Sequence, residues 1–299
     1  MDPDLAVITV SYASEDVLPA WFETLGRATN ADFVCVVADN APERGDAVRR
    51  VAEAHGAGYL PVAHNPGYGG AINAAVEALP STVRWIVISN PDVEFSPGAI
   101  DRMLEALVAH DDTGAVGPRV LRPDGTTYPS ARAVPSLVHG VGHALFGSIW
   151  PSNPWSKAYQ AGAVDPTVPR TAGWLSGSCL AVRREAFERI GGFDDGFFMY
   201  FEDVDLGYRL GVAGFTNVYE PAAVVTHVGA HSTSKHGRRM LEAHHRSTMR
   251  FLEKRYHGPV YAPVRGLLRV GLALRLRLLA RRPGELSPDG ASRTRPRPR

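Results

Sequence analysis

The sequence predicts an α/β fold with a mostly parallel sheet flanked by helices and an amphipathic helical extension at the C-terminal end. Short apolar, β-branched runs alternate with segments of helical periodicity over the first 112 residues, a pattern typical of βαβ units. Polar residues stand where the predicted strands end, at Ser11, Asp39, Asn65 and Asn90. Ligands of open α/β sheets bind at that edge, so we expect a binding site there.

The first half divides into four strands and four helices. The apolar runs predict strands at 5–10, 33–38, 58–63 and 83–88. Helices are predicted between and after them, at 16–28, 44–55, 69–79 and 99–110. The helix at 16–28, for example, has apolar residues at helical spacing, including Val17, Trp21 and Leu25.

The segment from Thr113 to Val168 is less regular. Gly117-Pro118-Arg119 and Asp124-Gly125 are turn signals, and we expect a long excursion with one helix near 137–146. Regular structure then returns in five predicted elements: a strand at 180–182, a helix at 184–190, a helix from about Asp203, a strand near Val218 or Val224, and a helix at 238–256.

Composition excludes several classes of protein. The 299 residues allow one large domain or two small ones, and two cysteines in apolar contexts provide no disulfide framework. A reducing compartment is therefore expected. The N-terminus lacks the basic region and long apolar run of a signal peptide. No apolar stretch of about 18 residues predicts a membrane-spanning helix.

Charge is unevenly distributed. Residues 264–299 contain ten Arg against Glu285 and Asp289, a net of +8, so the remaining residues carry 1 − 8 = −7. Leucines and arginines alternate over 264–282, which favours a basic amphipathic helix at an anionic membrane surface. A helix packed on the domain, or a contact in a homo-oligomer, are the alternatives. Nucleic-acid binding is not expected, because no recognition fold accompanies the tail.

An acidic cluster follows an aromatic run. Phe197-Phe198-Met199-Tyr200-Phe201 precedes Glu202-Asp203-Val204-Asp205, and apolar surroundings raise the pKa of a carboxyl group. Such a cluster is typical of a general base, a metal ligand or an anchor for substrate hydroxyls. The alternative is an acidic first turn that the helix dipole stabilises.

Other motifs are open to two interpretations. The glycine-rich segment 65–73 suits an anion at a helix N-terminus or a tight packing turn. Asn90-Pro91-Asp92 holds a carboxylate that suits Mg²⁺ or Mn²⁺, although an Asx turn is the simpler interpretation. His227 suits a metal ligand or a structural role. Trp174, beside Gly177, suits either a sugar-stacking platform or the core.

Together these segments resemble the family 2 glycosyltransferases with the Rossmann-like GT-A fold. The resemblance spans residues 5–235 and is closest to the bacterial rhamnosyltransferase branch, whose actinobacterial members act on N-acetylglucosaminyl-diphospho-polyprenol. It rests on seven segments, together with His227: 7–12, 38–40, 65–73, 90–92, 117–119, 191–194 and 198–206.

The resemblance implies roles for individual residues. It assigns to the nucleotide sugar Ser11, Tyr12, Asp39, Asn40, Asn65, Gly67, Tyr68, Gly69, Asn73, Asn90 and Asp92. It makes Asp203 the general base beside Glu202, and Asp92 and His227 the ligands of a divalent cation, Mg²⁺ or Mn²⁺. Asn90 stands where many relatives have an aspartate. On the acceptor side it implies Trp174, Gly177, Asp205 and Arg209.

The implied activity is inverting transfer of rhamnose from dTDP-β-L-rhamnose to the 3-hydroxyl of GlcNAc on a polyprenyl diphosphate, in cell-wall linker synthesis. A UDP-hexose or galactofuranose donor is the alternative. A non-catalytic sugar-nucleotide-binding protein would lack the base, and a nucleotidyltransferase would need a basic Gly-rich loop in place of Val10–Ser14. The enzyme is expected at the cytoplasmic face of the plasma membrane as a peripheral protein.

The expected organisation has three parts. Residues 1–235 form the catalytic domain, with a nucleotide-binding half at 1–112 and an acceptor-binding half at 113–235. Residues 236–282 form C-terminal helices that associate with a membrane, and 283–299 form a disordered basic tail.

Overall fold

A computed structural model of the chain describes residues 3–135, 165–229 and 237–280. The chain divides into two compact units, Met1–Gly229 and Ala230–Arg299. The predicted helix at 137–146 and the basic tail lie outside the described residues.

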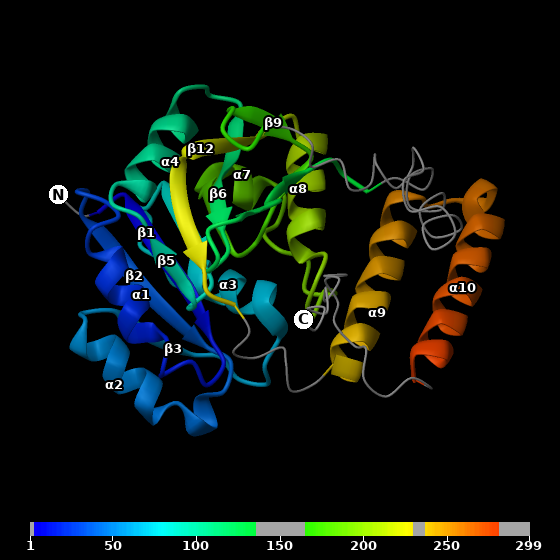
Figure 1. Cartoon of the computed structure of the whole chain (residues 1–299), viewed down its shortest axis with the longest axis horizontal. Coiled ribbons are helices and arrows are strands. Elements are labelled where there is room, and N and C mark those ends of the chain that lie inside the picture. Colours follow the sequence, from blue (N-terminus) through cyan, green and yellow to red (C-terminus); the bar gives the residue numbers. More distant parts are fainter. Residues whose placement is uncertain (1–2, 136–164, 230–236, 281–299) are drawn as a thin grey trace, which may run out of the picture. The chain divides into compact units, whose positions relative to one another are not determined.

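Unit 1 is built on a mixed sheet (Figure 1) with the strand order β3-β2-β1-β4-β11-β6-β12-β5. Its first four strands are parallel, as predicted: β1 (Leu5–Ser11), β2 (Phe33–Asp39), β3 (Gly58–Pro61) and β4 (Trp85–Ser89). The antiparallel strand β11 (Cys179–Arg183) joins β4 to β6 (Thr113–Leu121). Beyond β6 lie β12 (Thr216–His227), parallel to it, and β5 (Val93–Phe95), antiparallel to β12.

Successive residues of a strand point to opposite faces of the sheet. Both faces of this sheet carry apolar side chains, and helices cover both. One core contains Ala6 and Ile8 of β1 and side chains of three helices: α3 (Gly67–Glu77), α7 (Arg184–Arg189) and α8 (Glu202–Val212). The other contains Leu5 and Val7 and side chains of α1 (Leu18–Leu25), α2 (Asp46–Ala54) and α4 (Ala99–Val108). The result is a three-layer α/β/α fold.

Short strands extend the second half of unit 1. β7 (Thr127–Tyr128) pairs with β6, and β9 (Arg170–Ala172) pairs with β12. A separate ribbon joins β8 (Ala131–Arg132) to β10 (Trp174–Leu175). One 3-10 turn, Pro42–Arg44, precedes α2.

The prediction of a turn at Gly117-Pro118-Arg119 is wrong, because all three residues lie within β6. Pro118 pairs with Glu220, and the register of β12 shifts between Glu220 and Val224. Proline lacks a backbone donor and is tolerated in a sheet at such an irregularity. The same β12 contains both positions predicted as alternative strands, Val218 and Val224. Asp124-Gly125 does form a turn, with Gly125 at a φ of 79°.

Unit 2 is a pair of helices, α9 (Gly237–Arg255) and α10 (Ala262–Ala280), joined through a 3-10 turn at Pro259–Tyr261. Arg265 donates to the carbonyls of Tyr256 and Gly258, and Arg269 pairs with Glu253. Leu267, Val270 and Leu274 of α10 are 64%, 57% and 52% exposed. In the described part of the chain, no helix is both long and apolar enough to cross a membrane.

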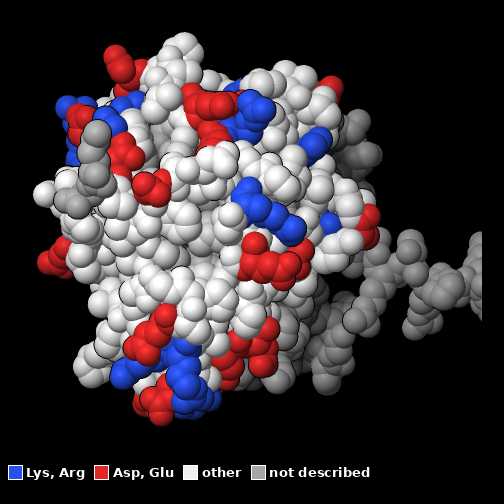
Figure 2. Space-filling model, turned by 90° about the vertical axis from the view of Figure 1, so that its left-hand side faces the viewer, with Lys and Arg blue, Asp and Glu red and all other residues white. Residues whose placement is uncertain are grey.

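The surface of the molecule carries both signs of charge. On the face shown in Figure 2, acidic and basic side chains are interspersed among large uncharged areas. Mixed charges at short range cancel at a distance, so this face has no extended field of one sign among the described residues.

Candidate active site

The ends of β1 and β2 lie side by side, and they place Ser11 opposite Asp39. Both side chains are fully buried. Asp39 accepts hydrogen bonds from the Ala41 backbone N–H at 3.1 Å and from the Tyr59 hydroxyl at 2.9 Å. Burial, followed by the charge and hydrogen bond of Asp39, raises the pKa of Tyr59 to about 12. Tyr59 is thus a neutral donor that orients the Asp39 carboxylate, which is predicted to bind the nucleotide sugar.

Two further predicted residues flank this carboxylate. Tyr12 is 50% exposed, and the Arg44 guanidinium lies 5.9 Å from its ring centre. The buried Asn40 donates from Nδ2 to the Gly67 carbonyl at 3.0 Å. Asn40 therefore ties the end of β2 to the glycine-rich turn at the start of α3.

The glycine-rich turn is in close contact with the loop that precedes α8. Asn65 accepts from the Gly67 N–H at 3.3 Å, and Gly67 has a φ of 89°. A Cβ at Gly67 would lie 2.1 Å from the Phe198 carbonyl oxygen, and one at Gly69 would lie 2.7 Å from Phe193. Backbone conformation and packing are sufficient to explain glycine at both positions, so neither glycine is evidence for a bound anion.

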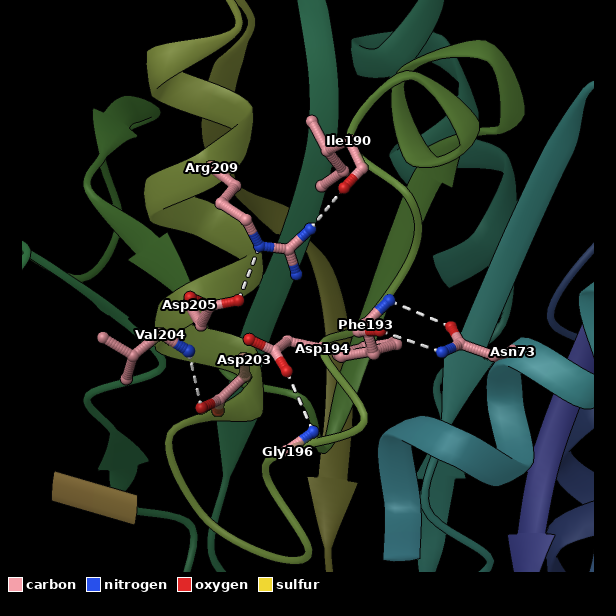
Figure 3. Close-up of polar contacts among 9 residues, drawn as sticks. All are labelled: Asn73, Ile190, Phe193, Asp194, Gly196, Asp203, Val204, Asp205 and Arg209. Atoms are coloured by element: carbon pink, nitrogen blue, oxygen red, sulfur yellow. Dashed lines mark hydrogen bonds and ion pairs between the residues drawn. The ribbon is translucent and has the colours of Figure 1, made fainter. Parts of the chain in front are cut away.

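Asn73 joins α3 to the same loop (Figure 3). Its side chain donates to the Phe193 carbonyl and accepts from the Phe193 N–H, both at 2.9 Å. It also donates to Asp195 at 2.9 Å. Predicted as a nucleotide-binding residue, Asn73 is engaged by the loop in this structure, and a contact with nucleotide stays a prediction.

A buried ion pair holds the other end of this loop. Arg209 donates to Asp205 at 2.6 Å and to the Ile190 carbonyl at 2.7 Å, as Figure 3 shows. The Asp205 side chain is fully buried, and that of Arg209 is 17% exposed. The loop ends in Tyr200 and Phe201, both with a positive φ, a conformation that costs free energy in non-glycine residues. The contacts on both sides of the loop therefore support a strained entry into α8.

The first turn of α8 contains the two acids predicted to be catalytic. Glu202 is 9% exposed, and its Oε2 atom has no hydrogen-bond partner among the described residues. Burial, followed by the charge of Asp203, raises the pKa of Glu202 to about 8. The raised pKa favours the protonated form of Glu202, beside an acid that can accept a proton.

Asp203 is half-buried and is held by backbone donors. Its two oxygens accept from the Gly177 N–H at 3.0 Å and the Val204 N–H at 2.8 Å. Burial raises the pKa of Asp203, while these N–H groups and the charge of Arg132 act in the opposite direction. A carboxylate whose pKa is raised and whose geometry is fixed suits a general base.

Gly177 lies between Asp203 and the nucleotide-binding half. The Tyr68 hydroxyl, from α3, donates to its carbonyl at 2.6 Å. Trp174, in β10, is 9% exposed and donates from its indole N–H to the Ala133 carbonyl at 3.1 Å. Little of the indole is therefore accessible to a sugar in this structure.

The end of β4 brings together the residues predicted for metal binding. His227 Nε2 lies 3.1 Å from Asp92 Oδ1 and 3.3 Å from Asn90 Nδ2. The Asp92 and His227 side chains are 14% and 30% exposed. Among the described residues, no group of three or more His, Cys, Asp or Glu side chains is arranged around a metal. One carboxylate and one imidazole fit a cation that takes its remaining ligands from water and a diphosphate, as Mg²⁺ commonly does.

Two observations link Asp92, in the turn after β4, to the acids of α8. The Asn90 N–H donates to the Ser178 carbonyl at 2.9 Å, and the adjacent Gly177 donates to Asp203. Burial raises the pKa of Tyr68 well above its ordinary value, and the carboxyl groups of Glu202, Asp203 and Asp92 raise it further. Tyr68 is therefore close to both acidic sites.

Sequence reasoning missed two residues of this neighbourhood. Tyr59 lies on the edge strand β3, where a tyrosine is common and gives no functional signal. Arg132 lies in the two-residue strand β8, which pairs with β10 across about 40 residues of chain. No periodicity reveals such a short, distant pairing.

A family model described as glycosyltransferase like family 2 matches residues 3–246 of the chain. The chain belongs to this family. It is a glycosyltransferase, and Asp92, Glu202 and Asp203 lie within the matched region.

The glycosyltransferase has a full-length relative in Mycobacterium tuberculosis, N-acetylglucosaminyl-diphospho-decaprenol L-rhamnosyltransferase. The two are 43% identical over 286 residues, which cover 93% of each chain. The rhamnosyltransferase WbbL of Escherichia coli K12 is 39% identical over 82 residues, which cover 27% of this chain and 31% of the relative.

Solved structures support the GT-A fold. The Pyrobaculum calidifontis mannosyltransferase PcManGT, in complex with GDP-Man and Mn²⁺, matches with a TM-score of 0.55 at 18% identity, over 94% of this chain and 76% of that one. GalNAc-T7 with UDP, GalNAc and Mn²⁺ also gives 0.55, at 14% identity, over 77% of this chain and 44% of that one.

Proposed function

We propose that this glycosyltransferase moves rhamnose from dTDP-β-L-rhamnose to the 3-hydroxyl of GlcNAc on a polyprenyl diphosphate, with inversion. The observation that carries this proposal is the 43% identity to the mycobacterial rhamnosyltransferase over 93% of both chains. The shared neighbourhood of Asp92, Tyr68 and Asp203 supports the chemistry.

In the proposed reaction Asp203 takes the proton of the acceptor hydroxyl while the new bond to the sugar forms. A sugar hydroxyl has a pKa far above 7, so a positioned base accelerates its attack. The sugar carbon passes through an oxocarbenium-like state, as in glycoside hydrolysis. One base on the face opposite the leaving group gives direct displacement and inversion. The Gly177 N–H holds Asp203 in place for this step.

The leaving diphosphate gains negative charge, and we propose that Asp92 and His227 hold a divalent cation against it. When bound, such a cation stabilises the developing charge on the leaving group. Asn90 contacts His227 and orients the imidazole. Ser11, Tyr12, Asp39 and Asn40 form the proposed nucleoside side of the donor site.

We also propose that α10 attaches the enzyme to the membrane that holds its acceptor. The exposed Leu267, Val270 and Leu274 follow helical spacing, so they share one side of α10. A basic helix with an exposed apolar side binds an anionic lipid interface. Replacement of Leu267 and Leu274 by Glu is expected to release the enzyme from anionic vesicles in a sedimentation assay. Val108→Glu, at an exposed apolar residue of α4, is the control, and unchanged sedimentation of the Leu variant contradicts the attachment.

A donor panel tests the activity. The purified enzyme is incubated with a short polyprenyl-diphosphate-GlcNAc and dTDP-rhamnose, UDP-glucose, UDP-galactose or UDP-galactofuranose, with and without EDTA. The proposal predicts a rhamnosylated product from dTDP-rhamnose alone and its loss with EDTA. Preferential use of a UDP-sugar would contradict the proposed donor, and full activity in EDTA would contradict the cation.

A further inference from the structure

The residues around Arg132 form an alternating stack of cations and aromatic rings. The Arg122 guanidinium lies 5.3 Å from the ring centre of Tyr128, and that of Arg132 lies 5.4 Å from the same ring. Arg132 also lies 5.5 Å from the ring centre of Trp174. A guanidinium between two rings is held in a defined plane.

Among the described residues, the Arg132 side chain makes fewer hydrogen bonds than that of Arg122. Arg132 Nε donates to the Pro129 carbonyl at 2.7 Å, and neither terminal nitrogen has a hydrogen-bond partner among the described residues. Arg122 NH1 donates to Thr126 and to the Thr127 carbonyl. Arg132 is half-buried and Arg122 is exposed. A half-buried, oriented guanidinium with two available terminal nitrogens is suited to bind an oxyanion.

The stack ends beside the catalytic turn of α8. Arg132 pairs directly with Trp174, and a Cβ at Gly207 would lie 2.7 Å from the Trp174 Cα. Gly207 is one helical turn beyond Asp203 on the same side of α8. Three residues after Trp174, Gly177 donates to Asp203. The positive charge of Arg132 reaches Asp203, since it opposes the effect of burial on the pKa of that acid.

The geometry points to Arg132 as a binding residue for the phosphate attached to the acceptor sugar. This inference rests on the proposed function, in which Asp203 deprotonates the 3-hydroxyl of GlcNAc and a diphosphate is attached at C1. The two positions belong to one pyranose ring, so the phosphate must lie about one sugar width from Asp203. The stack places the Arg132 guanidinium beside Trp174, which packs against Gly207 one helical turn after that acid.

Charge balance supports the same site. Residues 1–263 carry a net charge of −7, and the acceptor would bring its own negative charges next to Glu202 and Asp203. An anion beside carboxylates needs a local cation. The donor also has a diphosphate, but its proposed cation site is at Asp92 and His227. The inference therefore distinguishes two phosphate sites, one on each side of the reacting sugar.

Equilibrium binding tests this inference without turnover. The Kd is measured by calorimetry for a short polyprenyl-diphosphate-GlcNAc, for an uncharged alkyl β-GlcNAc and for dTDP with Mn²⁺. Arg132→Met, which keeps the packing stem, is expected to weaken the diphosphate acceptor about 10- to 100-fold, the range for a lost charge-assisted hydrogen bond. The uncharged glycoside and dTDP should bind as in the wild type. Arg122→Met removes an equal charge from the other side of Tyr128 and should leave all three affinities within about 3-fold.

Several outcomes would overturn the assignment. Equal weakening of charged and uncharged acceptors would make Arg132 a structural residue, and weaker binding of dTDP would place it at the donor. Unchanged affinity for the diphosphate acceptor would remove it from the site. If the charge-dependent loss is found but no donor gives a product, the proposed reaction fails while the phosphate site stands.

Discussion

The two acidic sites of the enzyme differ in how their negative charge is balanced. Asp92 lies just after a parallel strand, is partly open to solvent, and has the His227 ring beside it and Asn90 in contact with that ring. Glu202 and Asp203 are adjacent residues at the start of a helix, the first buried and the second half-buried. The arrangement around Asp92 suits cation binding, and that of Glu202 and Asp203 suits proton transfer.

A third carboxylate sharpens this comparison. Asp205 lies in the same helical turn as Glu202 and is also buried, but Arg209 neutralises it. Glu202 forms no ion pair with a cation among the described residues, and its pKa is raised by burial. Two buried acids three residues apart therefore have different surroundings: Asp205 is paired with Arg209, which contacts the Ile190 carbonyl, and Glu202 lies beside the proposed base Asp203.

The largest effect is expected from Asp203→Asn. Because this change removes the proton acceptor and keeps the shape, kcat should fall by about 10²- to 10⁴-fold. The affinity for dTDP with Mn²⁺ should stay at the wild-type value, since Asp203 lies on the acceptor side. Steady-state kinetics and calorimetry measure the two quantities, and wild-type turnover would remove Asp203 from the role of base.

Arg209→Met tests whether Asp205 belongs to the scaffold. It leaves a buried carboxylate without its cation, which costs about 3–5 kcal/mol of unfolding free energy. Urea denaturation followed by circular dichroism gives the value. The matched control is Arg102→Met, which breaks the exposed pair with Glu105 and should cost less than about 1 kcal/mol. Equal losses in both variants would contradict the anchoring role.

Asp92→Asn tests the cation site. Because the variant lacks the carboxylate proposed to hold the cation, kcat/KM should fall by on the order of 10²-fold, and half-maximal activity should require more Mn²⁺. Glu94→Gln, at an exposed neighbour on β5, should leave the Mn²⁺ titration unchanged. A variant at Asp92 with the wild-type Mn²⁺ requirement would place the cation elsewhere.

Asn73→Ala separates two roles for this residue. If Asn73 holds the loop before α8, the loss of its bonds to Phe193 and Asp195 should cost about 1–3 kcal/mol of unfolding free energy and lower kcat. The KM for the donor should change little. A raised donor KM with unchanged stability would support nucleotide binding instead.

The stability of the enzyme is also expected to depend on pH. The pKa of Glu202 is 4.5 when unperturbed and about 8 in the folded enzyme. Between these values the folded state keeps a proton that the unfolded state releases, so Glu202 makes stability fall as pH rises from 4.5 to 8, by at most about 1.4 kcal/mol per pH unit. Glu202→Gln should flatten this slope in denaturation at pH 5, 6, 7 and 8. Glu105→Gln, at an exposed site, should not.

The nucleotide-binding half of the fold was predictable because local patterns determine it. Apolar runs and helical spacing placed all four parallel strands and the helices between them, and strand ends placed Ser11 beside Asp39. The second half depends on long-range pairing. The strands β8 and β10 have two residues each, which is too few for a periodic signal. Pro118 lies within β6 where its pairing with β12 shifts register, whereas the local sequence predicts a turn there.

The candidate site was predictable in its residue types and less so in its contacts. The acidic cluster and the Asp92 motif stood out by composition. Their neighbours did not: the bond from Gly177 to Asp203 spans 26 residues and that from Tyr68 to Gly177 spans 109. Whether Asn73 and Gly67 contact nucleotide or hold a loop depends on packing against Phe193 and Phe198, which no local pattern contains.

The central claim is that Asp92 and Asp203 act on opposite sides of one reacting sugar. A crystal structure of the Asp203→Asn variant with Mn²⁺ and dTDP, using the anomalous signal of manganese, tests it most directly. The account predicts a manganese peak at Asp92 and His227, with the diphosphate extending from it toward Tyr68 and the substituted side chain at the start of α8. A peak bound by other residues, or a diphosphate on the far side of the sheet from Tyr68, would contradict it.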